Sequence, residues 1–126
     1  MASGSKRILL IEDEDFIRDL YKRQLDLAGF TTDAFGHGQD GLDALSQNSY
    51  DFILLDIMLP GVNGLDILRK VKGDEKTKNI PVILLTNLGQ DSIIKEGFAL
   101  GAKEHIIKAS FTPDQIVEKV KSLLGV

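Results

Sequence analysis

Uninterrupted apolar runs constrain the fold of this chain more than any other feature of its sequence. Three such runs occupy residues 8–11, 52–55 and 82–85. A strand with one solvated face alternates apolar and polar residues, so continuous runs predict strands that are covered on both faces, as in a parallel sheet. Residues 31–35 are expected to form a weaker strand at the sheet edge, and Ile106 with Ile107 a short fifth strand.

Amphipathic helical patterns separate these strands. Apolar residues recur at spacings of three and four, and the five patterns begin at Phe16, Leu42, Leu65, Ile93 and Ile116. Gly29 is expected to end the first helix, and Thr112–Pro113 provides an N-cap and an initial proline for the last. Strands and helices that alternate over short connections, with right-handed crossovers, predict an α/β doubly wound sheet with helices on both faces.

Size and composition exclude several classes of protein. At 126 residues the chain has room for one domain, and 43% hydrophobic residues suffice for a core. The 15 Lys and Arg are scattered and the net charge is -4, which argues against a nucleic-acid-binding surface. The absence of cysteine excludes disulfides and thiolate metal sites. No apolar run approaches a membrane span of about 18 residues, and no signal peptide is visible.

Polar residues with chemical capability follow the predicted strands. Glu12 and Asp13 come after the first apolar run, Asp56 after the third strand, Thr86 after the fourth and Lys108 after the fifth. Sites in open parallel sheets form outside the carboxyl ends of the strands, so these side chains are expected to converge. Each has an ordinary alternative: the acidic run can begin a helix, Asp56 can form a turn, Thr86 can cap a helix, and Lys108 can be an exposed charge. Their shared position at strand ends favours one common site.

Three converging carboxylates need a positive partner. Clustered carboxylates repel one another, and no ring of Lys or Arg is available to neutralise them. A hard divalent cation with oxygen ligands fits, and Mg²⁺ suits a site with a few carboxylates, retained waters and a phosphate. With Lys108 as a second positive charge and Thr86 as a donor, the set matches phosphoryl transfer to Asp56 as a carboxylate nucleophile.

Four segments of the chain, in order, resemble the receiver domain of two-component response regulators, and the chemotaxis regulators in particular. They are residues 8–14, 51–64, 81–86 and 101–108, and the segment around Asp56 is the most specific. The resemblance extends from Lys6 to Leu124. Residues 1–5 are small and polar and are interpreted as a tail or an expression remnant, which leaves 6–126 as the receiver domain. The family implies a flavodoxin-like sheet of five parallel strands in the order 2-1-3-4-5, with five helices.

The resemblance also implies a role for each candidate residue. Asp56 would take a phosphoryl group from the phosphohistidine of a sensor kinase or phosphotransfer protein. Mg²⁺ would be bound by Asp13, Asp56 and the backbone carbonyl of Met58, with Glu12 acting through water. Lys108 would pair with the phosphoryl group, and Thr86 would swing towards it as the switch.

Partners and setting follow from the same resemblance. The chain is expected to be a cytoplasmic signalling module rather than an enzyme, one that promotes its own phosphorylation and slow dephosphorylation. A downstream effector would bind the face made by the fourth helix, fifth strand and fifth helix. A phosphorylation-dependent dimer is one option. Direct contact with nucleic acid or a membrane is not expected.

Several positions depart from the usual family pattern. His105 stands where receivers carry Tyr or Phe, so it is either a switch residue coupled to Thr86 or a surface histidine on an edge strand. Ala109 replaces the usual proline after the lysine, and Asn87 is larger than the usual Ala or Gly. Met58 and Leu88 occupy the positions that tune aspartyl-phosphate lifetime. Because both are apolar, neither can orient a water, and slow self-dephosphorylation is expected.

Three other functions are compatible with parts of this sequence. A flavin-binding electron carrier shares the architecture, but the four carboxylates from Glu12 to Asp15 would repel a flavin phosphate. A haloacid-dehalogenase-type phosphatase needs a second Asp two residues after the nucleophile, where this chain has Met58. The alternative that stays open is a binding module with the receiver fold that is not phosphorylated. His105 and Ala109 favour it, whereas the survival of all five candidate site residues opposes it.

Overall fold

Five parallel strands form a single sheet in the order β2-β1-β3-β4-β5. The computed structural model describes residues 5–126, so most of the predicted tail, Met1 to Gly4, lies outside the described residues. The strands are β1 (Arg7–Ile11), β2 (Thr31–Phe35), β3 (Phe52–Asp56), β4 (Val82–Thr86) and β5 (Glu104–Ile107). The predicted doubly wound sheet and strand order are confirmed, and β2 lies at one edge as expected.

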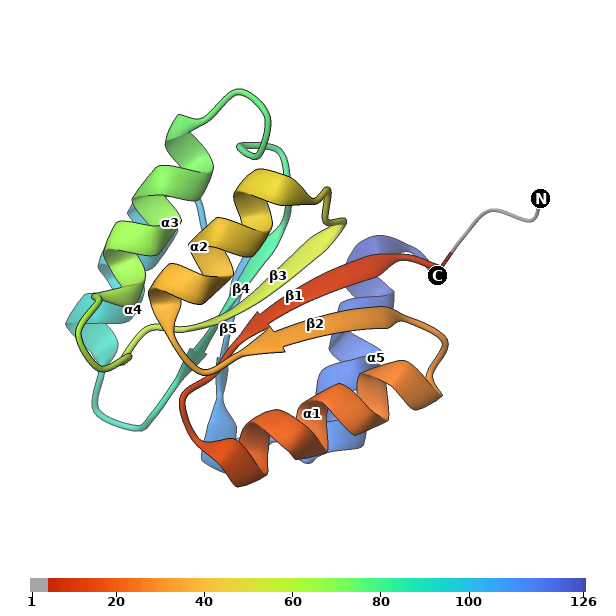
Figure 1. The fold of residues 1–126 in the computed structure, drawn as a ribbon. Helices are drawn as coiled ribbons and strands as arrows, with labels where there is room; N and C mark the ends of the chain where they lie inside the picture. Colours follow the sequence, from red (N-terminus) through yellow and green to blue (C-terminus); the bar gives the residue numbers. More distant parts are fainter. Residues whose placement is uncertain (1–4) are drawn as a thin grey trace.

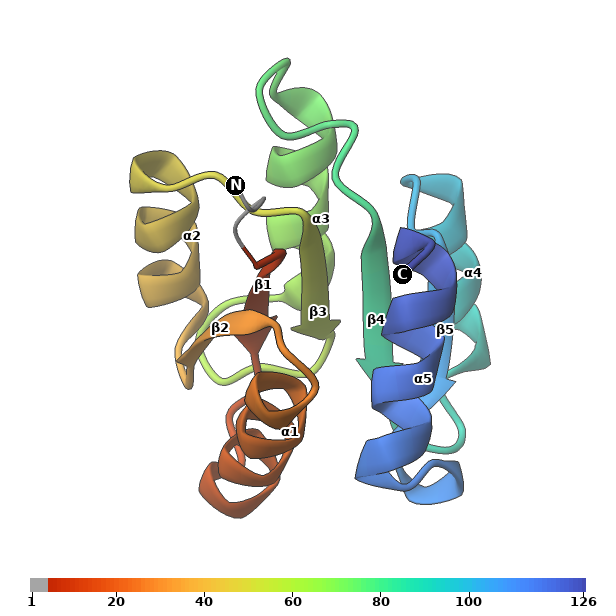
Figure 2. The same cartoon turned by 90° about the vertical axis from the view of Figure 1, so that its right-hand side faces the viewer.

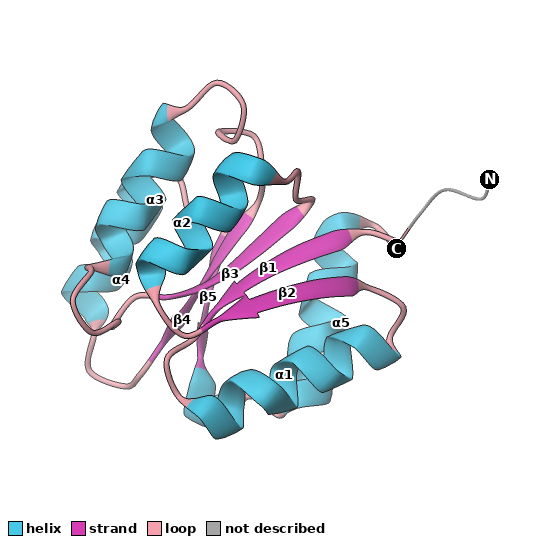
Figure 3. Ribbon diagram, in the orientation of Figure 1, coloured by secondary structure: helices cyan, strands magenta, loops and turns pink. Residues whose placement is uncertain are grey.

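Helices cover both faces of this sheet. They are α1 (Asp15–Leu27), α2 (Gly38–Gln47), α3 (Gly64–Gly73), α4 (Asp91–Ala99) and α5 (Pro113–Leu124), with a short 3-10 turn η1 (Lys108–Ser110) after β5. α1 and α5 lie on one face, and α2, α3 and α4 lie on the other (Figures 1 and 3). Among the described residues, no helix has the length and hydrophobicity needed to cross a membrane.

The continuous apolar runs are explained by two separate cores. Successive residues of a strand point to opposite faces, so Ile8 and Leu10 pack under α1 and α5 while Leu9 and Ile11 pack under α2 and α3. All five residues of β3 and of β4 are buried, because these central strands are covered on both sides. Only the residue at the carboxyl end of each, Asp56 or Thr86, is polar.

Local signals for helix ends are also confirmed. Thr112 forms a capping box with Gln115 at the start of α5, and its side chain accepts a hydrogen bond from the Gln115 amide. Gly29, just after α1, adopts a φ of 100° that only glycine tolerates readily. Asn63 caps α3 by accepting from the Leu65 amide at 2.9 Å. The 3-10 turn at Lys108 was not expected from the sequence.

Candidate functional site

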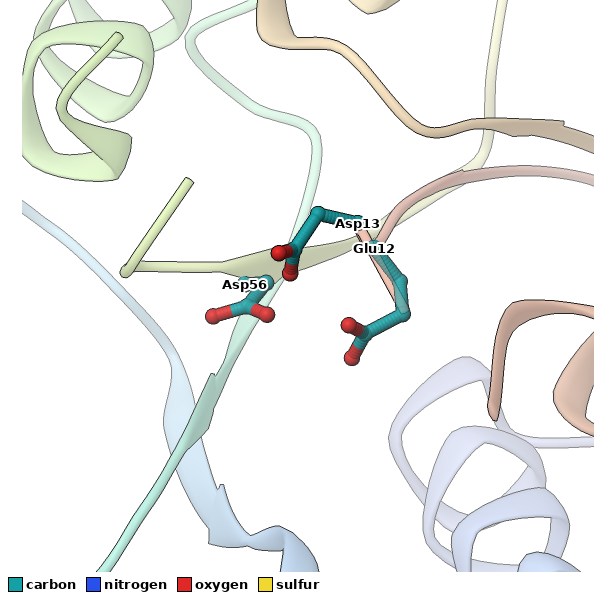
Figure 4. Close-up of side chains that lie close together, drawn as sticks. All are labelled: Glu12, Asp13 and Asp56. Atoms are coloured by element: carbon teal, nitrogen blue, oxygen red, sulfur yellow. The ribbon is translucent and has the colours of Figure 1, made fainter. Parts of the chain in front are cut away.

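The acidic residues lie where the order of strands in the sheet reverses. From β1 the chain crosses to β2 on one side, and β3 lies on the other side of β1. The loop after β1 carries Glu12 and Asp13, and β3 ends at Asp56. The three carboxylates converge on one region, with one oxygen from each within 4.8 Å of the others (Figure 4). The predicted convergence at this switch point is therefore found in the structure.

Asp56 is buried and held through both carboxylate oxygens. Its side chain has 3% exposure, Oδ1 accepts from the Met58 amide at 2.9 Å, and Oδ2 accepts from Lys108 Nζ at 3.0 Å. Burial raises the pKa of Asp56 above its ordinary value, although these two donors oppose the shift. The Asp56 carboxylate is therefore held in one orientation by two donors.

Glu12 is the second buried carboxylate. Its Oε2 accepts from the Glu14 amide at 3.1 Å, and its Oε1 accepts from Lys108 Nζ at 2.9 Å. Burial first, and then the charge of Asp56, raises the pKa of Glu12 to about 7. Asp13 is only half-buried, so it is the member of the cluster that faces solvent most.

Lys108 joins the two buried carboxylates from the far edge of the sheet. It follows β5 and opens the 3-10 turn, and its side chain is 6% exposed. Burial lowers the pKa of Lys108, but its hydrogen bonds to Glu12 and Asp56 outweigh this and hold the pKa above its ordinary value. It also lies 3.5 Å from Glu14 Oε1, a contact that the sequence did not indicate. Lys108 is therefore a charged part of the site and not an exposed surface charge.

Thr86 lies at the same edge but its hydroxyl is engaged elsewhere. The residue is buried, and Oγ1 donates to the backbone carbonyl of Ile106 in β5 at 3.3 Å. A role as donor to a phosphoryl group on Asp56 therefore requires Thr86 to rotate away from Ile106. Asn87, which follows it, is exposed, and its amide donates to Gln90 Oε1 at 2.7 Å.

His105 packs against α4. The residue is half-buried on β5, and its ring meets Phe98 edge-to-face, with centroids 5.7 Å apart and planes at 88°. This contact shows that His105 is not a free surface side chain. Whether it acts as a switch stays a prediction.

The loop after Asp56 turns back sharply to begin α3. Met58 pairs with Asn63 in an isolated antiparallel bridge, and the Gly64 amide donates to Ile57 O at 3.2 Å. A Cβ on Gly64 would lie 2.5 Å from Ile57 Cα and 2.7 Å from Asp56 O, closer than real contacts allow. Gly64 therefore lets α3 begin directly against the backbone that carries Asp56.

The ligand chemistry of the cluster fits a hard divalent cation. Glu12, Asp13 and Asp56 all offer carboxylate oxygens, the ligands that hard cations prefer. Lys108 is the ammonium that pairs with two of these three carboxylates, so the partly buried cluster keeps a net negative charge. Burial raises the pKa of both Glu12 and Asp56, and the charge of Asp56 adds to the shift at Glu12. The role of the Met58 carbonyl stays a prediction, although the Met58 amide already anchors Asp56.

Two further residues, both on α1, interact with the site by contact or by charge and were not predicted from the sequence. Arg18 of α1 donates to the backbone carbonyl of Glu12 at 3.0 Å. Tyr21, one turn later and buried, has its pKa raised to about 12 by burial and by the charge of Glu12. The sequence did place both residues in the first turns of the helix that follows Glu12 and Asp13. Periodicity alone does not tell a residue that contacts the site from one that packs in the core.

Comparison with known proteins gives one consistent family. The family model of the response regulator receiver domain matches residues 8–121. The transcriptional regulatory protein SrrA of Staphylococcus aureus is 38% identical over 120 residues, which is 95% of this chain and 48% of SrrA. The chain therefore spans about half the length of this curated relative.

Solved structures agree with the sequence relatives. The response regulator receiver domain protein of Methanospirillum hungatei, described as CheY-like, superposes with a TM-score of 0.89 at 25% identity, over 97% of this chain and 95% of that one. The receiver domain of a signal transduction histidine kinase from Syntrophus aciditrophicus gives a TM-score of 0.86 at 29% identity, over 96% and 91%.

Proposed function

The chain belongs to the response regulator receiver domain family of two-component signalling, and we propose that Asp56 is its phosphate acceptor. The observation that carries the proposal is the convergence of Glu12, Asp13 and Asp56 with Lys108 at the carboxyl edge of the sheet. Receiver domains are signalling domains that work with sensor kinases and effectors. We take residues 6–126 as the domain, and a cytoplasmic location stays a prediction.

The proposed reaction is transfer of a phosphoryl group from a phosphohistidine of a sensor kinase or phosphotransfer protein. A carboxylate oxygen of Asp56 attacks phosphorus, a P–O bond forms as the P–N bond breaks, and the departing imidazole takes a proton from solvent. Asp56 is fixed for this attack because the Met58 amide and Lys108 each hold one of its oxygens. Positioning and charge neutralisation provide most of the rate in such transfers.

Asp13, Asp56 and the carbonyl of Met58 would hold Mg²⁺, with Glu12 acting through water. When bound, Mg²⁺ supplies the positive charge that offsets the carboxylates and the transferred phosphoryl oxygens. Lys108 then pairs with a phosphoryl oxygen, and its position 3.0 Å from Asp56 Oδ2 requires only a small displacement. Thr86 breaks its hydrogen bond to Ile106 and turns towards the phosphoryl group.

The output follows from the release of Thr86. Its partner Ile106 is in β5, and α4 and α5 flank β5 at this edge of the sheet (Figure 2). A change at Thr86 therefore acts first on the α4-β5-α5 face, where we place the downstream effector or a second copy in a phosphorylation-dependent dimer. The His105–Phe98 contact between β5 and α4 lies within that face.

Binding of beryllofluoride in the presence of Mg²⁺ tests the proposal. Beryllofluoride imitates the phosphoryl group, and we expect ¹⁹F NMR to detect a bound species that requires Mg²⁺ and disappears in Asp56→Asn. Asp40→Asn, an exposed aspartate in the first turn of α2, is the matched control and should bind normally. Absence of binding by the unsubstituted protein would favour the alternative, a receiver fold used without phosphorylation.

A further inference from the structure

Arg18 is hydrogen-bonded to the backbone of the loop that carries Glu12 and Asp13. Its side chain, 20% exposed, folds back from α1, and Nη1 donates to Glu12 O at 3.0 Å and lies 3.4 Å from Asp13 O. The second nitrogen, Nη2, lies 2.7 Å from Asp15 Oδ1. A planar guanidinium with several donors in fixed directions can hold two carbonyls and a carboxylate at once, as an ammonium cannot. Arg18 thus fixes the backbone of Glu12 and Asp13.

Gly36 provides the space that this guanidinium occupies. Gly36 follows β2, and a Cβ built on it would lie 2.7 Å from Arg18 Nη1 and 3.3 Å from Cζ. Gly36 is not among the glycines with positive φ, so its backbone does not itself require glycine. The neighbouring Phe35 carbonyl accepts from the Glu12 amide at 3.0 Å, which joins the same two loops. Glycine at position 36 therefore leaves the room that the Arg18 guanidinium needs.

We propose that Arg18, seated in the space left by Gly36, is a positioning residue that holds the Glu12–Asp13 loop ready to bind a divalent cation. The carboxylates of Glu12, Asp13 and Asp56 repel one another before a cation arrives, and the loop must resist that repulsion. A backbone that is already in place spares the cation the cost of ordering its ligands. The inference rests on the proposed function but concerns only the binding of the metal.

A double-mutant cycle tests it with Mg²⁺ alone as the probe. Calorimetric titration would measure the Mg²⁺ dissociation constant of Arg18→Ala, Gly36→Ala and the double variant. We expect each single substitution to weaken binding about tenfold, the range seen when residues that orient metal ligands are lost. The double variant should bind no more weakly than Arg18→Ala, because the new Cβ at position 36 then fills vacated space. Arg18→Lys should restore only part of the affinity.

Controls separate positioning from a general loss of stability. Arg23→Ala, an exposed arginine of the same helix, should leave the Mg²⁺ affinity unchanged. Thermal unfolding in EDTA should show that Gly36→Ala stays folded, since the new Cβ meets only the far end of the Arg18 side chain, which can be displaced without moving backbone. Normal Mg²⁺ affinity in Gly36→Ala and Arg18→Ala, or an equal loss from Gly36→Ala with and without Arg18, would overturn the inference. If the unsubstituted protein binds no Mg²⁺, the proposed function fails along with it.

Discussion

Lys108 Nζ lies 3.0 Å from Asp56 Oδ2, although 52 positions separate the two residues in the chain. The same ammonium lies 2.9 Å from Glu12 Oε1, and all three side chains are 6% exposed or less. Water can replace a partner at an exposed ion pair, but here it has little access. The stability of the metal-free site therefore depends on Lys108, and several consequences can be measured.

Lys108→Met should lower the free energy of unfolding by about 3 kcal/mol at pH 7 in EDTA, because it leaves two buried carboxylates without their cation while keeping the aliphatic length. Urea denaturation measures this change. Lys119→Met is the matched control, since Lys119 and Glu104 are 3.4 Å apart and about one-third exposed. Loss of that pair should cost less than about 1 kcal/mol. Equal losses in the two variants would contradict the view that burial makes Lys108 important.

Glu12 should make the metal-free protein less stable as the pH rises. Its pKa is about 7 in the folded protein against an ordinary 4.5, so the folded state binds the proton more tightly. The resulting stabilisation is complete below pH 4.5 and is lost as the pH rises through 7. Between pH 5 and 8 we expect the unfolding free energy to fall by about 2 kcal/mol through this group.

Glu12→Gln should remove that part of the pH dependence, as measured by urea denaturation at several pH values in EDTA. Glu14→Gln should keep it, because the Glu14 side chain is 56% exposed. An unchanged slope in Glu12→Gln would show that another group causes the loss of stability.

Gly64→Ala should destabilise the protein by about 1 to 3 kcal/mol, since its Cβ would collide with the backbone of Asp56 and Ile57. It should also weaken beryllofluoride binding, because the strain falls on the residue that binds it. Gly73→Ala, at the other end of α3, meets nothing within 4 Å and should be neutral or slightly stabilising. Thermal unfolding and ¹⁹F titration of the two variants provide the comparison; similar behaviour would refute the steric argument.

The aspartyl phosphate should be long-lived, because Met58 and Leu88 offer no group that could orient a water. Both residues are largely exposed, Met58 at 53% in the loop after β3 and Leu88 at 73% in the loop after β4. Met58→Asn should shorten the lifetime severalfold, measured as phosphate release from the phosphorylated protein. Leu27→Asn, at a position on α1 that is 76% exposed, should leave it unchanged. A lifetime of seconds in the unsubstituted protein would rule out this role for the two apolar residues.

Most of the fold could be predicted because its signals are local. The continuous runs at residues 52–55 and 82–85 predict buried central strands, and Thr112–Pro113 predicts the start of α5. The same pattern identified Asp56 and Lys108 as residues at strand ends. These predictions need only neighbours within a few positions, together with the rule that parallel strands end at one edge.

The sequence by itself determined the order of strands and helices, and which polar residues would meet at the carboxyl edge. Only the tertiary structure decided how they meet: that Lys108 joins Glu12 as well as Asp56, that Thr86 points to Ile106, and that His105 packs on Phe98. The fit of Arg18 to Gly36 likewise appears only when α1 and the end of β2 are brought together. The direction of a side chain depends on partners that are far away in the chain, and the spacing of apolar residues along the sequence does not specify those partners.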